Sequence, residues 1–465
     1  MQTCQRCLSS RCPGRTSRRR FLTTAGVTAA AVQMDLFDLA SSLFTAETKP
    51  EKKPRVGVVF LRRTKGGGCT WPTGTTEQLQ DMQAMFTKTM ADAAGKLGVQ
   101  LDVMPKPLEN VDAYLNQLKA APPDGLIVIA MGLNAAWRSG KAQKLVQNRG
   151  DIPTIVYANV TAFTPNYLTV ARAPKTYLGA TQDVGWLAFA VRLLYTVWRM
   201  KSMRVLACPT KNYYDEFKKV EDGKELRALA DFYEKNAKKI VEPKPADILE
   251  AVKHYIVLRR LVREGQYDGV TVRGPLCIGG KNPACVAVSR LLDEGIVAAC
   301  EGDMPAAACQ LLTLSLFDRP GFMGNPSPNT VNNTLIVTHC TSALKLDGID
   351  KPYRAPFVLR DFHAMGGVAP MVEWPVGREA TIMDLLGKDS MILGGGKTIA
   401  NTESIAQPPC GGCRTSVEFE LDGVADTLEV DKGHHKWCIL ENEVRPIKAY
   451  CQLAGIKVAD LTGRA

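Results

Sequence analysis

The segment Ile296–Asp303 reads Ile-Val-Ala-Ala-Cys-Glu-Gly-Asp, an apolar run that ends on two carboxylates. A short apolar run bounded by turn residues predicts a buried strand. The apolar residues between Val286 and Leu292 have helical spacing, and Pro283 suits the first position of that helix. Ligands of parallel sheets bind beyond the carboxyl ends of the strands, so Glu301 and Asp303 are candidate site residues.

The same alternation of strand and helix extends on both sides of this segment. Thr75 and Gln78 have capping-box spacing ahead of an apolar helix face that reaches Leu97. Further apolar runs predict buried strands at Arg55–Phe60, Gly125–Ala130, Arg204–Ala207 and Gly269–Val272. Residues 417–421 instead alternate apolar and acidic side chains, which is typical of a strand with one wet face.

These patterns predict an α/β protein with two parallel-sheet α/β domains of Rossmann or flavodoxin-like type, followed by a β-rich C-terminal domain. We expect a signal and linker over residues 1–48, α/β domains over 49–180 and 181–330, and the β-rich domain over 331–465.

Paired imidazoles, His434 and His435, follow Gly433 in the last third of the chain, and His339 and His363 lie in the same third. Carboxylate oxygens and imidazole nitrogens are ligands of divalent cations, so these histidines and the Glu301–Asp303 turn predict a metal site between two domains. The alternative is that the carboxylates open a helix and the histidines are polar loop residues.

The formal net charge of +11 does not indicate nucleic-acid binding, because six arginines within residues 1–31 supply more than half of it. The body has no run of basic residues interleaved with aromatic ones, so we expect no nucleic-acid partner.

Residues 17–22 read Ser-Arg-Arg-Arg-Phe-Leu and precede a weakly apolar stretch, Thr23–Ala31, that ends in small residues. This order resembles a twin-arginine export signal, and the alternative is a disordered basic arm. The resemblance implies the twin-arginine translocation machinery as a partner and a periplasmic or extracellular location. The apolar stretch is too short and too weak to remain as a stable membrane span.

The chain has 14 cysteines, and an odd number remains once the three in the leader are set aside. These cannot all pair within one chain. Most lie within apolar runs, which indicates small buried hydrophobes: Cys208, Cys300, Cys309, Cys438 and Cys451. Cys410 and Cys413 form a C-x-x-C, for which we favour a local disulfide or a simple turn over zinc binding because no second pair matches it.

Four segments carry a family resemblance: Pro283–Leu312 with its Ala-Cys-Glu-Gly-Asp core, Leu335–Cys340 ending in Thr-His-Cys, Phe362–Pro370, and Gly433–Val458. They resemble the L-fucose isomerase-like group, relatives of L-arabinose isomerase, over most of residues 55–460. The resemblance implies three domains, an oligomer and a divalent cation, commonly manganese, held by a Glu, an Asp and a His. It also implies interconversion of aldose and ketose sugars through an enediol.

Asp303 and His435 match the family aspartate and histidine, which implies that both are metal ligands. We expect Glu301 and Asp303 to be catalytic, with Glu301 also a metal ligand. The expected substrate-binding residues are His363, His434, His339 and Trp71. Trp71 could stack on a sugar face, although a buried aromatic is the commoner outcome.

The family glutamate belongs one helix before Asp303, where this chain reads Asn-Pro-Ala-Cys-Val over residues 282–286. Glu301 could replace it, because residues 301 and 303 of an extended segment face the same way. Cys285 could ligate instead, which would favour Zn²⁺ over Mn²⁺.

We therefore expect an exported, divalent-metal-dependent aldose–ketose isomerase, an intramolecular oxidoreductase if active, that acts on a carbohydrate as a homo-oligomer. The alternative is a non-catalytic exported carbohydrate-binding protein that retains the isomerase scaffold.

Overall fold

The computed structural model describes residues 53–64, 75–158, 167–278, 280, 282–402, 413–422 and 432–461, and the chain from Pro50 onward forms one compact unit. The first sheet has five parallel strands in the order β2-β1-β3-β4-β5. The strands are β1 Arg55–Arg62, β2 Gln100–Val103, β3 Gly125–Met131, β4 Thr154–Ala158 and β5 Thr176–Ala180.

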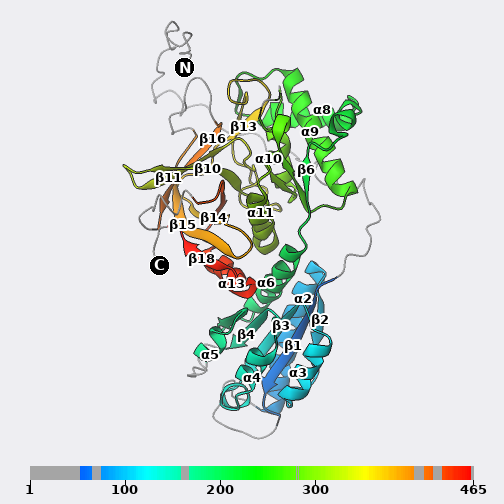
Figure 1. Ribbon diagram of the computed structural model, residues 1–465, viewed down its shortest axis with the longest axis vertical. Coiled ribbons are helices and arrows are strands. Elements are labelled where there is room, and N and C mark those ends of the chain that lie inside the picture. Colours follow the sequence, from blue (N-terminus) through cyan, green and yellow to red (C-terminus); the bar gives the residue numbers. More distant parts are fainter. Residues whose placement is uncertain are drawn as a thin grey trace, which may run out of the picture. The chain divides into compact units, whose positions relative to one another are not determined.

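Both faces of this sheet are covered by helices, which explains why its central strands are apolar throughout. Alternate residues such as Val58 and Ile127 share one core cluster with α2 (Thr76–Leu97) and α6 (Trp186–Lys201). The intervening residues pack in a second cluster with α3 (Val111–Ala120) and α4 (Lys141–Asn148). Figure 1 shows this part of the chain in blue to teal. A π-helix, Leu133–Arg138, and α5, Tyr167–Ala171, complete its connections.

A second parallel sheet has three strands in the order β6-β8-β9, namely β6 Val205–Cys208, β8 Gly269–Val272 and β9 Val297–Ala299. Its helices are α7 Tyr213–Lys218, α8 Lys224–Asn236, α9 Pro245–Glu264, α10 Cys285–Asp293 and α11 Met304–Phe317, with a 3₁₀ turn at Gly274–Leu276. Strand β7 (Lys239–Ile240) pairs with β12 (Phe357–Arg360), which also pairs with β13 (Ala369–Val372). This small sheet therefore joins the second α/β region to the last third of the chain.

The last third forms a closed six-stranded antiparallel barrel in the order β14-β17-β10-β11-β16-β15, closed by the pairing of β14 with β15. Its strands are β10 Phe322–Asn329, β11 Thr334–His339, β14 Glu379–Leu385, β15 Ser390–Asn401, β16 Thr415–Leu421 and β17 Lys436–Leu440. Strand β18 (Lys457–Asp460) follows α13 (Val444–Ala454) and adds to β15 in parallel. Closure leaves none of these six strands with an unpaired edge.

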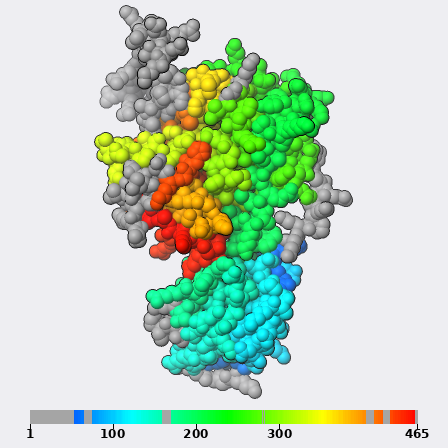
Figure 2. All heavy atoms as spheres, in the orientation of Figure 1, coloured from blue at the N-terminus to red at the C-terminus, as the bar shows by residue number. Residues whose placement is uncertain are grey.

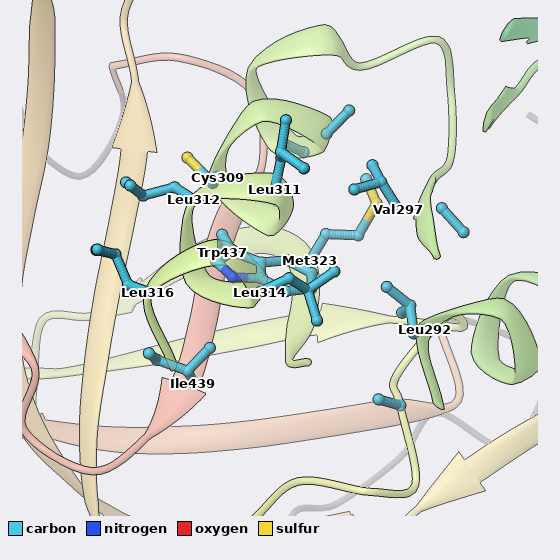
Figure 3. Close-up of a cluster of buried hydrophobic side chains, with 14 of the residues drawn as sticks. Leu292, Val297, Cys309, Leu311, Leu312, Leu314, Leu316, Met323, Trp437 and Ile439 are labelled. Atoms are coloured by element: carbon cyan, nitrogen blue, oxygen red, sulfur yellow. The ribbon is translucent and has the colours of Figure 1, made fainter. Parts of the chain in front are cut away.

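Helix α11 connects the second parallel sheet to the barrel. It is apolar nearly all round, as expected for a helix buried on every side. Figure 3 shows its leucines among β9, Met323 and the β17 residues Trp437 and Ile439. Trp437 Nε1 donates a hydrogen bond to Thr313 Oγ1 at 3.1 Å, which joins the helix to the barrel wall. In the space-filling view, orange and red barrel atoms lie directly against the green atoms of the preceding region (Figure 2).

The predicted fold class is wrong. Parallel strands form as expected, but the C-terminal region, predicted only as a β-rich domain after two parallel-sheet domains, is a closed six-stranded antiparallel barrel. Closure depends on pairs that are remote in sequence, such as Phe322 with Cys438. Alternation within residues 417–421 predicts a strand but carries no information about such partners. The domain boundaries at 48, 180 and 330 stay a prediction.

Several local predictions are confirmed. Thr75 and Gln78 form a capping box at the start of α2, and the predicted strands at residues 55, 125, 204 and 269 are β1, β3, β6 and β8. Pro283 as the first residue of its helix is wrong, because α10 begins at Cys285. The backbone N–H of Ala284 is already bonded to the Leu276 carbonyl at 2.8 Å, which holds the segment before the helix in a turn.

Candidate metal centre

The acidic turn follows β9 at the carboxyl end of the second parallel sheet. Glu301 (φ +60°) and Gly302 (φ +76°) are both left-handed, and the Gly302 N–H donates to the Val272 carbonyl at 3.0 Å. A non-glycine residue with this φ stores strain of order 1 kcal/mol. Asp303 caps α11, because its Oδ1 accepts a hydrogen bond from the Ala306 N–H at 2.8 Å. The turn thus directs two carboxylates toward the barrel.

The imidazoles come from two barrel strands. His339 is the last residue of β11, and His434 and His435 immediately precede β17. Gly433 introduces the pair with φ +80°, and a Cβ there would collide with the Asp384 carboxylate. Glycine is therefore required for the close approach that brings the two histidines to the end of the barrel.

The structure brings these groups together although 38 residues separate Glu301 from His339 and 132 separate Asp303 from His435. His435 Nδ1 donates to Asp303 Oδ2 at 2.8 Å, and His339 Nε2 lies 3.4 Å from Glu301 Oε1. His434 spans both carboxylates, at 3.6 Å from Asp303 Oδ2 and 3.7 Å from Glu301 Oε2. The side chains of His435, Asp303 and His339 are buried, whereas that of His434 is 57% exposed. His434 therefore lies at the rim of the cluster.

These residues could hold a metal ion in two overlapping sets, Glu301–His339–His435 and Asp303–His434–His435, each with donor atoms within 4.8 Å of one another. Within the described residues, the buried Nε2 of His435 has no hydrogen-bond partner. It lies 3.9 Å from Glu301 Oε2. Donors that share one ion are roughly 3.0–3.5 Å apart when each is about 2.1 Å from it. The donor atoms of the first set, which lie within 4.8 Å of one another, would therefore have to move closer together around an ion.

Asp303 is not a member of the Glu301–His339–His435 set, and its contacts fit a residue that orients His435. Both of its oxygens already accept hydrogen bonds, one from the Ala306 N–H and one from His435. A carboxylate bonded to the distal nitrogen of a ligating histidine fixes its tautomer and direction. Thr341 Oγ1 is 2.8 Å from His339 Nδ1 and does the same for the second imidazole.

The electrostatics keep the cluster in a ligating state. The hydrogen bond from His339 lowers the pKa of Glu301 against the opposing effect of burial. Burial acts to raise the pKa of Asp303, but the hydrogen bonds from His435 and Ala306 outweigh it and the pKa is lowered. Burial lowers the pKa of His339 more than Glu301 raises it. Charged carboxylates and a neutral imidazole at neutral pH are the forms that bind cations.

A buried ion pair lies inside the barrel beside this cluster. Lys436 Nζ donates to Asp384 Oδ2 at 3.1 Å, and both side chains are almost fully buried. Burial raises the pKa of Asp384 to about 6, with Lys436 opposing the shift and Asp303 adding to it. Because Lys436 follows His435 directly, this pair anchors the start of β17 and with it the imidazoles.

His363 lies in a different cluster from the carboxylates. Its Nε2 is 3.4 Å from Cys413 Sγ, and Cys340, His363 and Cys413 form a third group of closely spaced donor atoms. Cys285 packs in the same small cluster as Cys340. The hypothesis that Cys285 completes the carboxylate site is therefore not supported by its position.

The remaining sequence predictions have mixed outcomes. Trp71, Cys410 and the export signal lie outside the described residues. The expected buried cysteines are buried, namely Cys208, Cys300, Cys309, Cys438 and Cys451. The roles of Glu301, Asp303, His339, His434 and His435 stay predictions, although all five meet at one place.

Sequence reasoning missed the thiol–imidazole cluster. Its members come from α10, the end of β11, the loop after β12 and the approach to β16, so no local spacing reveals it. The available signals were the C-x-x-C that contains Cys413 and the succession of His339 and Cys340 at the end of β11.

No protein-family model matches this chain, and a search of curated proteins gave no significant match. In the part of the chain that the structure describes, no helix combines the length and hydropathy needed to cross a membrane.

Proposed function

We propose that this chain is a divalent-metal-dependent carbohydrate aldose–ketose isomerase, with Glu301, His339 and His435 as metal ligands and Asp303 as the residue that orients His435. The observation that carries the proposal is the buried Nε2 of His435, which has no hydrogen-bond partner among the described residues and lies beside a carboxylate and a second imidazole. Leaving such a nitrogen unpaired costs about 1–3 kcal/mol, which a bound cation would recover.

Manganese is the proposed physiological ion. One carboxylate and two imidazoles with an open side are a donor set that Mn²⁺, Fe²⁺ and Zn²⁺ all accept. The sulfur of Cys285, which would have favoured Zn²⁺, packs with other thiols away from this set. When bound, the cation would polarise the sugar carbonyl and stabilise negative charge on its oxygens.

A side chain next to the proposed cation would have to carry the proton. Moving a proton between neighbouring sugar carbons through an enediol requires a group that can accept and return it. His434 is proposed for this role, because its exposed ring contacts both carboxylates while making no short hydrogen bond to either. Glu301 remains the alternative base, with one oxygen toward His339 and the other toward His434.

The second candidate is a non-catalytic carbohydrate-binding protein on the same scaffold. The absence of a carboxylate where the family has its glutamate favours it, since Cys285 occupies that region and is buried among thiols. A site with a cation and without a competent base would bind polyols through the metal and leave them unchanged.

Export through the twin-arginine pathway to the periplasm or cell exterior, and assembly into a homo-oligomer, belong to the same proposal. The motif at residues 17–22 and the family resemblance support them.

The experiment is isomerisation in D₂O with the purified mature chain, Mn²⁺ and a panel of aldoses. Ketose formation, or solvent deuterium at C2, is expected for the wild type and should be lost in Glu301→Gln. Glu250→Gln, which changes an exposed carboxylate on α9, is the matched control and should behave as wild type. Sugar binding without deuterium uptake would favour the binding protein, and the lack of both would overturn the two proposals together.

A further inference from the structure

We propose a second metal site, in which Cys285, Cys340, His363 and Cys413 bind one zinc ion. It is separate from the carboxylate–imidazole cluster and does not depend on the proposed isomerase function.

Three of the donor atoms converge from separate segments, and Cys285 packs beside them. Cys413 Sγ lies 3.4 Å from His363 Nε2, and these atoms and Cys340 Sγ lie within 4.8 Å of one another. Cys285 and Cys340 belong to one small cluster of buried residues, and Cys413 packs against that cluster. Three thiols and one imidazole make the Cys₃His set of closed structural zinc sites.

The surroundings suit a closed site. Cys285 and Cys340 are buried, and Phe362 and Ala369 pack around them. The Arg414 N–H donates to Cys340 Sγ at 3.3 Å, an interaction that stabilises a thiolate. The Arg414 guanidinium is held by Asp361, with Nε donating to the Asp361 carbonyl at 2.7 Å.

The backbone at the imidazole is held in an unfavourable conformation. His363 (φ +51°) and Ala364 (φ +60°) are both left-handed, and the ring of His363 stacks on Phe362 with 4.2 Å between centroids. A pair of strained residues persists only where the surroundings enforce it. A bond from Nε2 to a metal would be such a restraint.

Sulfur donors select the ion. Thiolates prefer zinc to manganese, whereas carboxylates accept manganese, the harder ion. The two clusters would therefore bind different metals. The zinc site would tie the start of α10 to the barrel strands β11 and β16 and to the loop after β12. Because Cys340 follows His339, it would also hold the end of β11 in place.

The test is zinc content, by elemental mass spectrometry, of full-length protein purified without chelator. We expect about one zinc per chain that survives in Glu301→Gln, and at least a tenfold loss in Cys340→Ser. Cys451→Ala, which removes a buried thiol elsewhere, is the matched control and should keep its zinc. Unchanged zinc in Cys340→Ser would overturn the proposal.

A second measurement covers the case in which Cys340→Ser does not fold. Wild-type protein reconstituted with Co²⁺ should show thiolate-to-metal charge transfer and tetrahedral visible bands, and His363→Ala should alter both. Absence of these bands from the wild type, or recovery of a Cys340–Cys413 disulfide from native unreduced protein, would overturn the proposal. Neither result bears on sugar isomerisation, so failure here is distinguishable from failure of the proposed function.

Discussion

The end of strand β11 belongs to two clusters of opposite chemistry. His339 faces Glu301 and His435, where the donors are oxygen and nitrogen, whereas Cys340 faces thiols and His363. Successive residues of an extended chain point to opposite sides, so a single strand end can serve both. The two clusters therefore differ in donor type even though they share neighbouring residues of the chain. Donor type determines which ion a cluster of side chains prefers.

The two clusters also differ in openness. The carboxylate–imidazole cluster has an exposed member, His434, and a nitrogen without a hydrogen-bond partner among the described residues. In the other cluster Cys285 and Cys340 are buried with Phe362 and Ala369, and His363 and Cys413 are half-buried. An open coordination position is needed for chemistry on a substrate, and a closed one is typical of structural metal. Variants that change one cluster at a time test whether the two clusters differ in this way.

The largest effect is expected from His435→Asn, which removes the proposed ligand atom Nε2 while keeping a polar side chain. Affinity for Mn²⁺, measured by calorimetric titration of chelator-treated protein, should fall by more than about 100-fold. The zinc content should not change. Equal Mn²⁺ affinity in the variant and the wild type would remove His435 from the proposed ligand set.

Gly433→Ala should destabilise the fold by about 3 kcal/mol or more, because the added Cβ meets the Asp384 carboxylate and φ is +80°. Gly377→Ala is the control. Its φ is +88° but nothing lies within 4 Å of the added atom, so it should cost only the conformational strain of about 1–2 kcal/mol. Urea unfolding measures both variants. Equal losses of stability in the two variants would show that a Cβ at residue 433 does not collide with the Asp384 carboxylate.

His254 adds a third imidazole to this comparison, because it is buried with the Tyr213 hydroxyl 2.8 Å from its Nδ1, whereas the other two clusters hold carboxylates or thiols. Burial lowers its pKa to about 4, against about 6.5 in the unfolded chain. Above pH 6.5 both states are neutral. Below it only the unfolded state gains the proton, so stability should fall by up to about 3 kcal/mol between pH 6.5 and 4.

The check on this prediction is the pH dependence of urea unfolding in the wild type and in His254→Phe. The variant should be less stable at pH 7 but should lose less further stability on acidification. Parallel curves for the two proteins would show that His254 does not titrate as described.

Asp303→Asn tests the orienting role with the smallest structural change. Asparagine still caps a helix, so α11 should keep its stability to within about 0.5 kcal/mol. The neutral amide holds the His435 imidazole less firmly, and Mn²⁺ affinity should fall by about 10- to 100-fold. Calorimetric titration measures the affinity and urea unfolding the stability. A loss as complete as that in His435→Asn would instead identify Asp303 as a ligand.

Sequence patterns predicted that Glu301, Asp303, His434 and His435 would lie close together, but they did not predict the fold that brings them there. An apolar strand that ends on Glu301 and Asp303 implies carboxylates at a sheet edge, and the placement of His434 and His435 before another apolar run implies a second strand end. What could not be predicted was the pairing of β10 with β17 and of β14 with β15, because strand partners are chosen by packing across the whole barrel.

The thiol cluster escaped prediction for the same reason. The sequence predicted His363 as a substrate-binding residue. Only the fold of the loop after β12 shows that it lies against Cys413. Likewise, the sequence gives no reason to rank His339 above His363, since the burial that distinguishes His339 comes from β11 and β16 within the closed barrel.

The most direct test of the central claim is a crystal structure of the chain with Mn²⁺, using anomalous scattering to locate the ion. We predict one manganese peak roughly 2.0–2.3 Å from Glu301, His339 Nε2 and His435 Nε2, with Asp303 hydrogen-bonded to the opposite nitrogen of His435. A fully loaded crystal with no manganese peak among these three residues would contradict it.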